Sequence, residues 1–434
     1  MVARHPAAML RLRQNDLDGR MMKKHNTDAR EVLLADLCYP DQIGQYGIPA
    51  AGEPYTKDKN RYLRITDISD DGLLLDADKK GVSGAIDERY FLSEGDVVFA
   101  RTGNSTGRSY LYDKNDGRLV YAGFLIKYKL DPTKVNPRYI HYFTQSAYYK
   151  AWVKNLSVGS TRGNISATTF AECPIYLPDR IRQDCLVDVL STIDRKIALN
   201  RKRIATLEAM AKEIYDYWFV QFDFPDAHGR PYKSSGGAMV YNPDLKREIP
   251  KEWEVVKLSR MADFLFGYPF DSSRFNSNGE GRRIVRIRNV KDGYSNDFTT
   301  EEAPSEYIIR NGDLLIGMDG YFDMNIWVGG DAYLVQRSCR VKAKDGIYQG
   351  YVRRFIAPPI KQLEKTLLGA TVAHLGKTHL DDIDIVVPPK DVRAFQMLND
   401  LDASIVQQGL EVAKLSVLRD FLLPVLMNGQ VRVG

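Results

Sequence analysis

Apolar residues recur every three or four positions along two long stretches of the chain, which predicts two long helices. The first stretch runs from Leu186 to Trp218, and its apolar positions alternate gaps of four and three residues. This 3.5-residue repeat is typical of the seam of a coiled coil. The same spacing returns near the C-terminus, where every seam position lies 208 residues after its counterpart. The central seam positions are Leu190, Ile193, Ile197, Asn200, Ile204 and Leu207 in the first helix and Leu398, Leu401, Ile405, Gln408, Val412 and Leu415 in the second.

One polar slot interrupts each seam, at Asn200 in the first helix and at Gln408 in the second. If the helices pair antiparallel, we expect the two amides to come close enough to satisfy each other and to help fix the register. A seam of this length corresponds to a rod of ~50 Å, at 1.5 Å per residue. The alternative is two unrelated amphipathic helices, each covering a core of its own.

A strand-rich segment from Val32 to Pro178 precedes the first helix. Within it, residues 61–68 alternate in the manner of a strand, and residues 95–101 form a turn and a short buried strand. Residues 137–154 are predicted to be helical. Between the first helix and the second half, the stretch from Pro225 to Pro250 is rich in glycine and proline and is predicted to be a linker.

The second half of the chain repeats the first. Residues 283–290 echo residues 61–68, and residues 312–318 echo residues 95–101. A repeat this long indicates a duplication rather than a solenoid. The order predicts an α+β protein in which an antiparallel two-helix coiled coil separates two mixed α/β domains related by a pseudo-twofold repeat. The predicted boundaries are 1–30 for an N-terminal lead, 31–178 for the first domain, 179–224 for the first helix, 225–254 for the linker, 255–388 for the second domain and 389–434 for the second helix. The lead is expected to be either a disordered segment or an over-extended start, with Met21 or Met22 as the first residue.

Polar loops in both globular segments carry side chains that suit DNA. Arginine matches the acceptors of guanine and asparagine those of adenine, whereas lysine, serine and threonine suit phosphates. Each loop can also be read as a solvated surface turn. Arg283, Arg286 and Arg288 stand at strand spacing, and residues 377–379 are expected in a loop. The candidate DNA-binding residues are Arg64, Arg101, Thr102, Asn104, Arg108, Thr161, Arg162, Asn164, Arg283, Arg286, Arg288, Lys377, Thr378 and His379.

Composition and charge narrow the picture only a little. The net charge of +5 is mild and by itself indicates no partner. The basic residues Arg195, Lys196, Arg201, Lys202 and Arg203 lie off the seam, which favours a solvated face or a protein-binding surface over a DNA contact. Four widely spaced cysteines indicate reduced thiols of a cytoplasmic protein. No apolar run is long enough for a bilayer, so no membrane is expected.

The sequence contains no complete P-loop and no Cys-x-x-Cys pair. Residues 376–378 resemble the end of a P-loop, but Thr371 stands where that motif requires a glycine. The sequence also lacks the Asn-Pro-Pro-Tyr and Asp-Pro-Pro-Tyr motifs of amino-methyltransferases and the Glu-x-Lys motif common in restriction nucleases. We therefore expect a non-catalytic chain with no metal and no cofactor of its own.

The duplicated plan resembles the specificity (S) subunit of type I restriction-modification systems. The resemblance covers nearly the whole chain after about Val32 and rests on the order of three stretches, residues 159–178, 193–204 and 249–258. The second half departs from the first, because Val372-Ala-His-Leu-Gly376 replaces Arg162-Gly-Asn-Ile-Ser166. That departure weakens the transfer of DNA contacts to the second half.

The resemblance implies a part in phage defence. The two globular domains would be target recognition domains, each reading one half of a bipartite asymmetric site in double-stranded DNA. The helices would be conserved spacers that dock two modification subunits, which bind S-adenosylmethionine and methylate adenine. Restriction subunits would join them for cleavage with ATP and Mg²⁺, so these cofactors are expected on partners.

Two other functions were weighed. An enzyme fused from a methyltransferase or a nuclease would need motifs that this chain lacks. A non-catalytic coiled-coil adaptor that binds only proteins would explain the seams. It would not explain why two domains with polar loops are duplicated and why their loops diverge.

Overall fold

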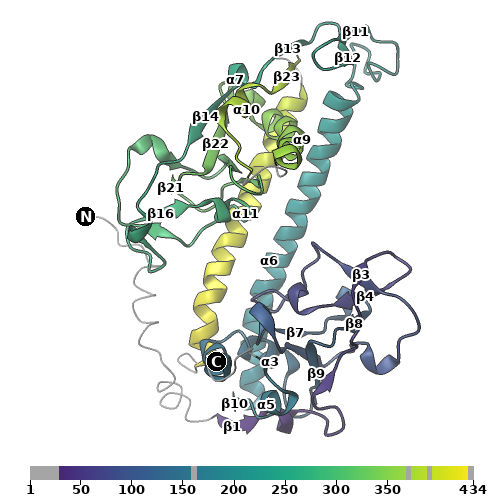
Figure 1. Cartoon of the computed structure of the whole chain (residues 1–434), viewed down its shortest axis with the longest axis vertical. Helices are drawn as coiled ribbons and strands as arrows, with labels where there is room; N and C mark the ends of the chain where they lie inside the picture. Colours follow the sequence, from purple (N-terminus) through teal and green to yellow (C-terminus); the bar gives the residue numbers. More distant parts are fainter. Residues whose placement is uncertain (1–28, 158–163, 368–372, 389–392, 429–434) are drawn as a thin grey trace. The chain divides into compact units, whose positions relative to one another are not determined.

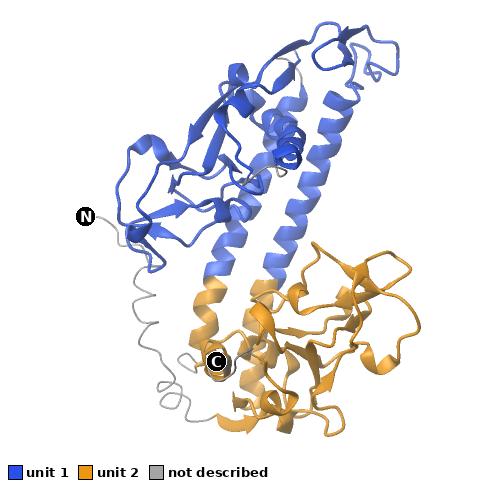
Figure 2. Cartoon of the chain, viewed as in Figure 1, with its two compact units in different colours: residues 1–14, 195–417 blue, residues 15–194, 418–434 orange. Residues whose placement is uncertain are grey.

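The computed structural model describes residues 29–157, 164–367, 373–388 and 393–428. The chain divides into two compact units (Figure 2). Unit 1 comprises residues 1–14 and 195–417, and unit 2 comprises residues 15–194 and 418–434. The predicted lead, 1–30, therefore lies almost entirely outside the described residues.

The two predicted long helices are confirmed as α6 (Arg180–Tyr215) and α11 (Arg393–Met427), and α6 ends in a π-helical turn, η6 (Asp216–Val220) (Figure 1). They run antiparallel within unit 1. Lys196 of α6 contacts Glu411 of α11 at 3.4 Å, whereas Glu208, further along α6, shares Arg353 with Asp402, which lies earlier in α11. The parts of the two helices in unit 2 are antiparallel as well, because Leu186 and Leu190 of α6 belong to one core with Leu423 and Leu426 of α11.

Half of the twelve central seam residues are buried and the other half are partly buried, and the two amides do not satisfy each other. Antiparallel pairing through Lys196 and Glu411 sets Asn200 and Gln408 at nearly the same level of the helix pair. Asn200 is 0% exposed, yet neither its amide nitrogen nor its oxygen bonds to any described residue, and the Gln408 oxygen is likewise unpaired. The predicted mutual hydrogen bond is therefore wrong. In this register the Asn200 amide reaches no hydrogen-bond partner among the described residues.

The globular domain of unit 2 contains two four-stranded sheets. The main sheet has the order β2-β9-β6-β7, and the second has the order β3-β5-β4-β8, in which β4 and β8 are parallel. A separate antiparallel pair joins β1 to β10. The strands are β1 (Arg30–Leu33), β2 (Gln45–Tyr46), β3 (Glu53–Pro54), β4 (Asn60–Leu63), β5 (Lys80–Val82), β6 (Asp96–Ala100), β7 (Ser109–Leu111), β8 (Leu119–Tyr121), β9 (Leu125–Lys129) and β10 (Pro174–Leu177). The helices are η1 (Leu34–Leu37), η2 (Ile65–Asp67), η3 (Glu88–Tyr90), η4 (Gly103–Ser105), η5 (Lys114–Asp116), α3 (Pro137–Phe143), α4 (Ala147–Ser157) and α5 (Ala167–Ala171).

The domain of unit 1 repeats this plan, which confirms the duplication. Its main sheet, β14-β22-β19-β20, matches β2-β9-β6-β7 strand for strand, and β13 pairs with β23 as β1 pairs with β10. Its second sheet, β15-β17-β16-β21-β18, contains the equivalent parallel pair β16 and β21. The strands are β13 (Glu254–Lys257), β14 (Ala262–Phe266), β15 (Phe275–Asn276), β16 (Arg282–Val285), β17 (Phe298–Thr299), β18 (Ile308–Ile309), β19 (Leu314–Gly317), β20 (Met324–Ile326), β21 (Ala332–Leu334), β22 (Ser338–Ala343) and β23 (Asp384–Val387). The helices are α7 (Leu258–Met261), η7 (Ser272–Arg274), α8 (Ile287–Val290), η8 (Ser305–Tyr307), η9 (Gly346–Tyr348), α9 (Gln349–Leu367) and α10 (Lys377–Asp381).

Two expected elements are shorter than predicted. The helix expected over residues 137–154 is two helices, α3 and α4, because Ser146 accepts a hydrogen bond from the Tyr149 amide and caps a new start. The strand expected over residues 61–68 ends at Leu63. There Asp67 accepts the Arg64 amide at 2.8 Å and turns the chain into η2.

The predicted linker, 225–254, is a folded part of unit 1. It contains the antiparallel hairpin of β11 (Met239–Asn242) and β12 (Arg247–Pro250). Trp253 is 6% exposed and stacks on Phe224 with ring centroids 5.1 Å apart. The stretch predicted as a linker thus carries a folded hairpin, and its apolar residues Ile249 and Trp253 pack in one core with Phe219 at the end of α6.

Candidate nucleic-acid interface

Three segments far apart in sequence meet where β6 ends in unit 2. The Arg101 amide donates to the carbonyl of Phe124 at 3.1 Å, and the Arg101 carbonyl accepts the Ile165 amide at 2.9 Å. These backbone bonds bring Asn164, just before Ile165, and the turn at Phe124 between β8 and β9 to the same edge, at the end of β6. Predicted residues Arg101 and Asn164 thus lie together.

This edge combines a cation, an amide and two aromatic rings. The Arg101 guanidinium stacks on the Tyr46 ring, 5.0 Å from its centroid, and its Nε is buried without a hydrogen bond to any described residue. Asn164 is exposed, and Phe124 and Tyr46 are exposed by 61% and 43%. We call Tyr46, Arg101, Phe124 and Asn164 the unit 2 edge. Large exposed rings beside an arginine suit contacts with bases.

The same backbone framework recurs in unit 1 with different side chains. The Met318 amide donates to the Arg337 carbonyl at 2.9 Å, and the Met318 carbonyl accepts the Leu375 amide at 2.7 Å. Arg337 therefore occupies the place of Phe124. His374, just before Leu375, occupies the place of Asn164.

Asp319 organises this second edge. Its carboxylate holds Arg337 Nε at 3.2 Å and His374 Nδ1 at 2.6 Å, while both partner side chains stay mostly exposed. Arg337 has a φ of 69°, which is unfavourable for a residue with a Cβ and places strain at this turn. Tyr321, 71% exposed, lies two residues beyond Asp319. We call Asp319, Tyr321, Arg337 and His374 the unit 1 edge.

The predicted loop after β6 has the expected polar, glycine-containing character. Thr102 precedes η4 and is half-buried, and Asn104 is exposed. Gly107 has a φ of 85°, and a Cβ there would lie 2.5 Å from Val153. Only glycine fits this close approach, so the loop is held against α4.

Two of the predicted arginines in unit 2 are engaged by acidic residues of the same domain. Arg64 pairs with Asp67 at 2.6 Å and with Asp78 at 3.2 Å, and the hydrogen bonds to Asp67 raise the pKa of Arg64. Arg108 contacts Asp70 at 2.7 Å and donates to the Ile68 carbonyl at 3.0 Å. These contacts stabilise the fold around η2, which makes both residues weaker candidates than Arg101. Thr161 and Arg162 lie outside the described residues.

The three predicted arginines of unit 1 do not share one strand. Arg283 lies on β16 between the rings of Tyr294 and Phe298, whose centroids are 4.9 and 5.1 Å away. Arg286 and Arg288 lie at and within α8, because Asn289 accepts the Arg286 amide and ends the strand. Arg283 also donates to the Ser295 carbonyl. Arg286 stacks on Phe275 at 5.3 Å, and Arg288 pairs with Asp297 at 2.7 Å.

The residues expected in a later loop lie instead on a short helix, α10. Lys377 and Thr378 are exposed on its first turn, three and four residues after His374. His379 Nδ1 accepts the Gly376 amide at 3.0 Å, and this cap explains why a helix begins here.

Six edge residues were missed from the sequence. They are Tyr46, Phe124, Asp319, Tyr321, Arg337 and His374. Two signals were available. Matching residues 95–101 with 312–318 sets Asp319 opposite Thr102, and matching residues 162–166 with 372–376 sets His374 opposite Asn164. The turns that carry Phe124 and Arg337 offered no comparable signal, since each connects strands of two different sheets.

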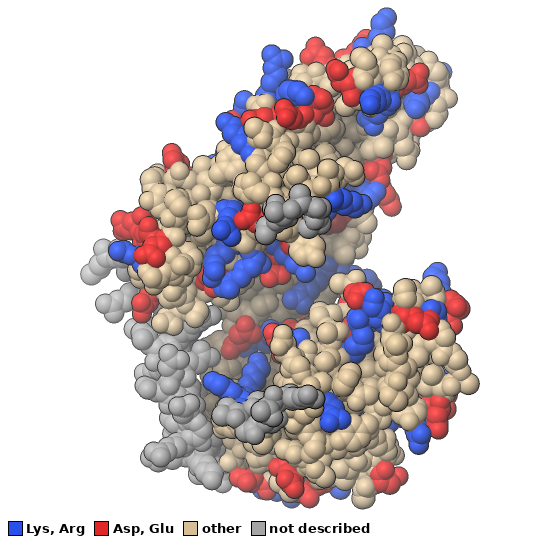
Figure 3. Space-filling model, in the orientation of Figure 1, with Lys and Arg blue, Asp and Glu red and all other residues tan. Residues whose placement is uncertain are grey.

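Charge and metal chemistry single out no further site. Basic and acidic side chains are interspersed over the face in Figure 3, as the small net charge suggests. Among the described residues, no group of histidine, cysteine, aspartate and glutamate side chains is placed to hold a metal ion. No helix in the described part of the chain is both long and apolar enough to cross a bilayer.

Comparison with known proteins gives one consistent answer. Residues 34–209 and 250–414 match the family described as the type I restriction modification DNA specificity domain. The type I restriction enzyme MjaIX specificity subunit of Methanocaldococcus jannaschii is 24% identical over 307 residues, covering 68% of this chain and 69% of its own. The MjaVIII specificity subunit of the same organism is 23% identical over 361 residues, covering 79% and 80%.

A solved structure has the same fold. The type I restriction-modification system S subunit from M. genitalium superposes with a TM-score of 0.56 at 16% identity, covering 92% of this chain and 96% of that one. The family match spans both halves of the duplication, including most of α6 and α11. The chain therefore belongs to the type I restriction-modification DNA specificity family, and it is a non-catalytic specificity subunit that recognises DNA sequence.

Proposed function

We propose that the unit 2 edge and the unit 1 edge each read the bases of one half of a bipartite asymmetric site in double-stranded DNA. One observation carries this proposal. The same backbone framework presents Arg101, Phe124 and Asn164 in one domain but Met318, Arg337 and His374 in the other. A duplicated framework with different side chains is what two readers of different half-sites require.

The chemistry of the unit 2 edge favours particular bases. Arg101 can donate two hydrogen bonds to guanine, and Asn164 can pair with the donor and acceptor of adenine. Phe124 offers an apolar face to a thymine methyl group. The Arg101 guanidinium stacks on the Tyr46 ring, which holds its orientation before DNA binds. Arg101 therefore loses less conformational entropy on binding.

The unit 1 edge is built around a held arginine. Asp319 lies 3.2 Å from Nε of Arg337, and the Arg337 side chain remains 67% exposed, so its guanidinium is accessible to DNA. His374, fixed by the same carboxylate, stands beside it. This arrangement suits guanine recognition by Arg337, with Lys377 and Thr378 placed for phosphate contacts.

The long helices would dock two modification subunits. On α6, Leu199 and Met210 are 45% and 47% exposed, and the basic residues 201–203 are exposed as well. Apolar side chains left outside the seam beside a charged run suit a protein partner. In the assembled complex, S-adenosylmethionine, ATP and Mg²⁺ would be bound by modification and restriction subunits, in the prokaryotic cytoplasm where the DNA substrate lies.

Single-residue variants test the reading edges. We expect Arg101→Ala to relax one base position in one half-site and Arg337→Ala to relax one position in the other, when methylation is mapped with modification subunits present. Arg310→Ala is the matched control, since Arg310 is exposed near the opposite end of β19. Unchanged methylation patterns and affinities in both edge variants would rule out base reading by these edges.

A further inference from the structure

Each globular domain is bound to its long helix by equivalent residues in the two repeats. The third residue of α3, Tyr139, donates its hydroxyl to the Tyr176 carbonyl of β10 at 2.6 Å. The third residue of α9, Tyr351, donates in the same way to the Val386 carbonyl of β23. The two short helices are thus held at the same point of the two domains, which makes residues of α3 and α9 comparable one by one.

Three residues further along, each short helix reaches an aspartate of the long helix. Tyr142 donates to Asp194 of α6 at 2.7 Å, and Arg354 donates to Asp402 of α11 at 2.7 Å. Asp194 and Asp402 are themselves 208 residues apart, which is the spacing of the seam repeat. The aspartate is therefore retained in both halves, although its partner changed from a tyrosine to an arginine.

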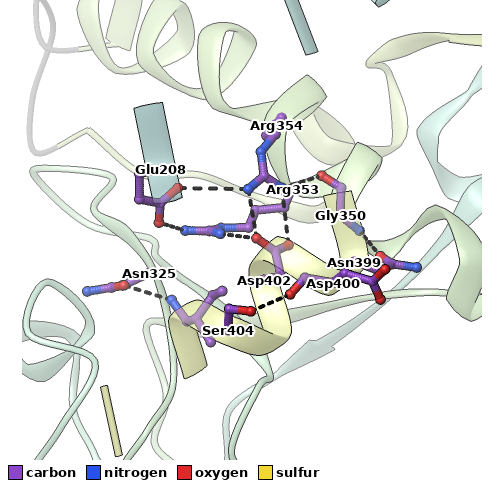
Figure 4. Close-up of polar contacts among 10 residues, drawn as sticks. Glu208, Asn325, Gly350, Arg353, Arg354, Asn399, Asp400, Asp402 and Ser404 are labelled. Carbon is purple, nitrogen blue, oxygen red and sulfur yellow. Dashed lines mark hydrogen bonds and ion pairs between the residues drawn. The ribbon is translucent and has the colours of Figure 1, made fainter. Parts of the chain in front are cut away.

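Both aspartates also connect to the opposite long helix. Asp194 lies 3.5 Å from Arg419 of α11. Asp402 lies 2.5 Å from Arg353, whose other terminal nitrogen binds Glu208 of α6, as Figure 4 shows. Each aspartate therefore joins three helices: its own long helix, the short helix of the domain and the opposite long helix. We call these two arrangements the Asp194 anchor and the Asp402 anchor.

Most anchor side chains are withdrawn from water, whereas Asp194 and Glu208 are 29% and 39% exposed. The side chains of Arg354, Arg353 and Asp402 are 9%, 13% and 14% exposed, and Arg419 is 14% exposed. Partly buried ion pairs add little net stability, because the cost of desolvation offsets their attraction. Their bonds are directional, however, and several converge on one carboxylate. They are suited to fixing an orientation rather than to holding the fold together.

Close backbone packing supports the same role in unit 1. The Gly350 amide, in the first turn of α9, donates to the Asn399 side chain of α11 at 2.8 Å. A Cβ at Gly350 would lie 2.9 Å from both the Asn399 oxygen and the Leu398 backbone. The start of α9 is therefore seated directly on α11 beside the Asp402 anchor.

We propose that Asp194 and Asp402 are positioning residues that fix the angle of each recognition domain on the helix pair and so set the spacer length that the protein accepts between its half-sites. The inference rests on the proposed two-reader function. A domain that turns on its helices moves its reading edge along the DNA, and one base pair corresponds to roughly 3.4 Å of helix axis.

The test compares Asp402→Ala with Asp400→Ala in the complex with modification subunits. Asp400 is exposed on the same helix, and its carboxylate contacts only Gln396 among the described residues. Methylation rates are measured on DNA with the natural spacer and with spacers one base pair longer and shorter. For Asp402→Ala we expect the preference for the natural spacer to fall about tenfold, as for a lost charge-assisted hydrogen bond. Both half-site sequences should stay the same, and Asp400→Ala should behave as wild type.

Tyr142→Phe provides a second, milder variant at the Asp194 anchor, because it removes only one hydroxyl. It should also broaden the accepted spacer range, and it keeps the test open if Asp402→Ala does not fold. A folded anchor variant that keeps the full spacer preference would overturn the inference. A wild-type complex indifferent to spacer length would instead overturn the two-reader function on which the inference rests.

Discussion

Among single residues, substitution of Arg337 should distinguish an effect on DNA affinity from an effect on the free energy of unfolding. Its positive φ of 69° costs free energy in a residue with a Cβ, and its side chain is 67% exposed. Arg337→Gly should therefore weaken DNA binding by ~1–3 kcal/mol if the arginine contacts a base. The same variant should leave the free energy of unfolding unchanged or raise it by up to ~1 kcal/mol.

Titration of DNA and thermal unfolding measure these two effects in parallel. Arg337→Ala is the control, because it removes the guanidinium but keeps the Cβ and hence the strain. A glycine variant that binds DNA as tightly as wild type would remove Arg337 from the reading edge.

Arg64 should show the reverse behaviour. It was predicted from sequence as a DNA contact, but Asp67 and Asp78 bind its guanidinium, and its side chain is only 25% exposed. Arg64→Ala should lower the free energy of unfolding by ~1–3 kcal/mol, because the part-buried Asp67 carboxylate would lose its charged hydrogen-bond partner. DNA affinity per folded molecule should stay close to wild type. A variant of normal stability with weakened, less salt-dependent DNA binding would restore Arg64 as a phosphate contact.

Among the secondary-structure elements, the seam of α6 and α11 contains a polar residue whose side chain makes no hydrogen bond to a described residue. Asn200 is fully buried, and neither polar atom of its amide bonds to a described residue. Asn200→Leu should therefore raise stability by ~1–3 kcal/mol, through relief of the desolvation penalty. Asn136→Leu is the matched control of opposite sign, because the Asn136 amide bonds to Asp184 and caps α3. The thermal unfolding midpoints of both variants are compared with that of the wild type. A lower midpoint for Asn200→Leu would contradict an unpaired Asn200 amide.

The elements that the sequence predicts well are those with a strong period. The 3.5-residue repeat predicts α6 and α11 closely, and the burial of all five residues of β6 agrees with the short buried strand expected there. The reading edges were predicted only in part, at Arg101 and Asn164. Their other members come together through pairing across the sheet and through carboxylates such as Asp319, which one sequence does not display.

Local hydrogen bonds explain the remaining differences. Asp67 and Asn289 each turn a predicted strand into a helical turn, and His379 caps the start of α10. These side chains accept hydrogen bonds from backbone amides that would otherwise pair in a strand or remain in a loop. Whether such a bond forms depends on the folded conformation. The periodicity of apolar residues carries no information about them.

For the whole molecule, the duplication is the feature on which the two-reader function depends. Each domain has its own sheets and core, and each is bound to the long helices by its own anchor. The two edges differ in chemistry although their frameworks match. Each domain should therefore read its half-site without help from the other.

Exchange of one domain tests this claim most directly. Residues 255–388 are replaced by the matching domain of a relative that keeps arginines at the positions of Arg353 and Arg354, so that the Asp402 anchor is retained. Methylation of the chimera is then mapped with modification subunits present. We expect one half-site to change, while the other half-site and the spacer length persist. A simultaneous change in both half-sites would contradict this expectation, because the two domains would then read DNA as a coupled whole.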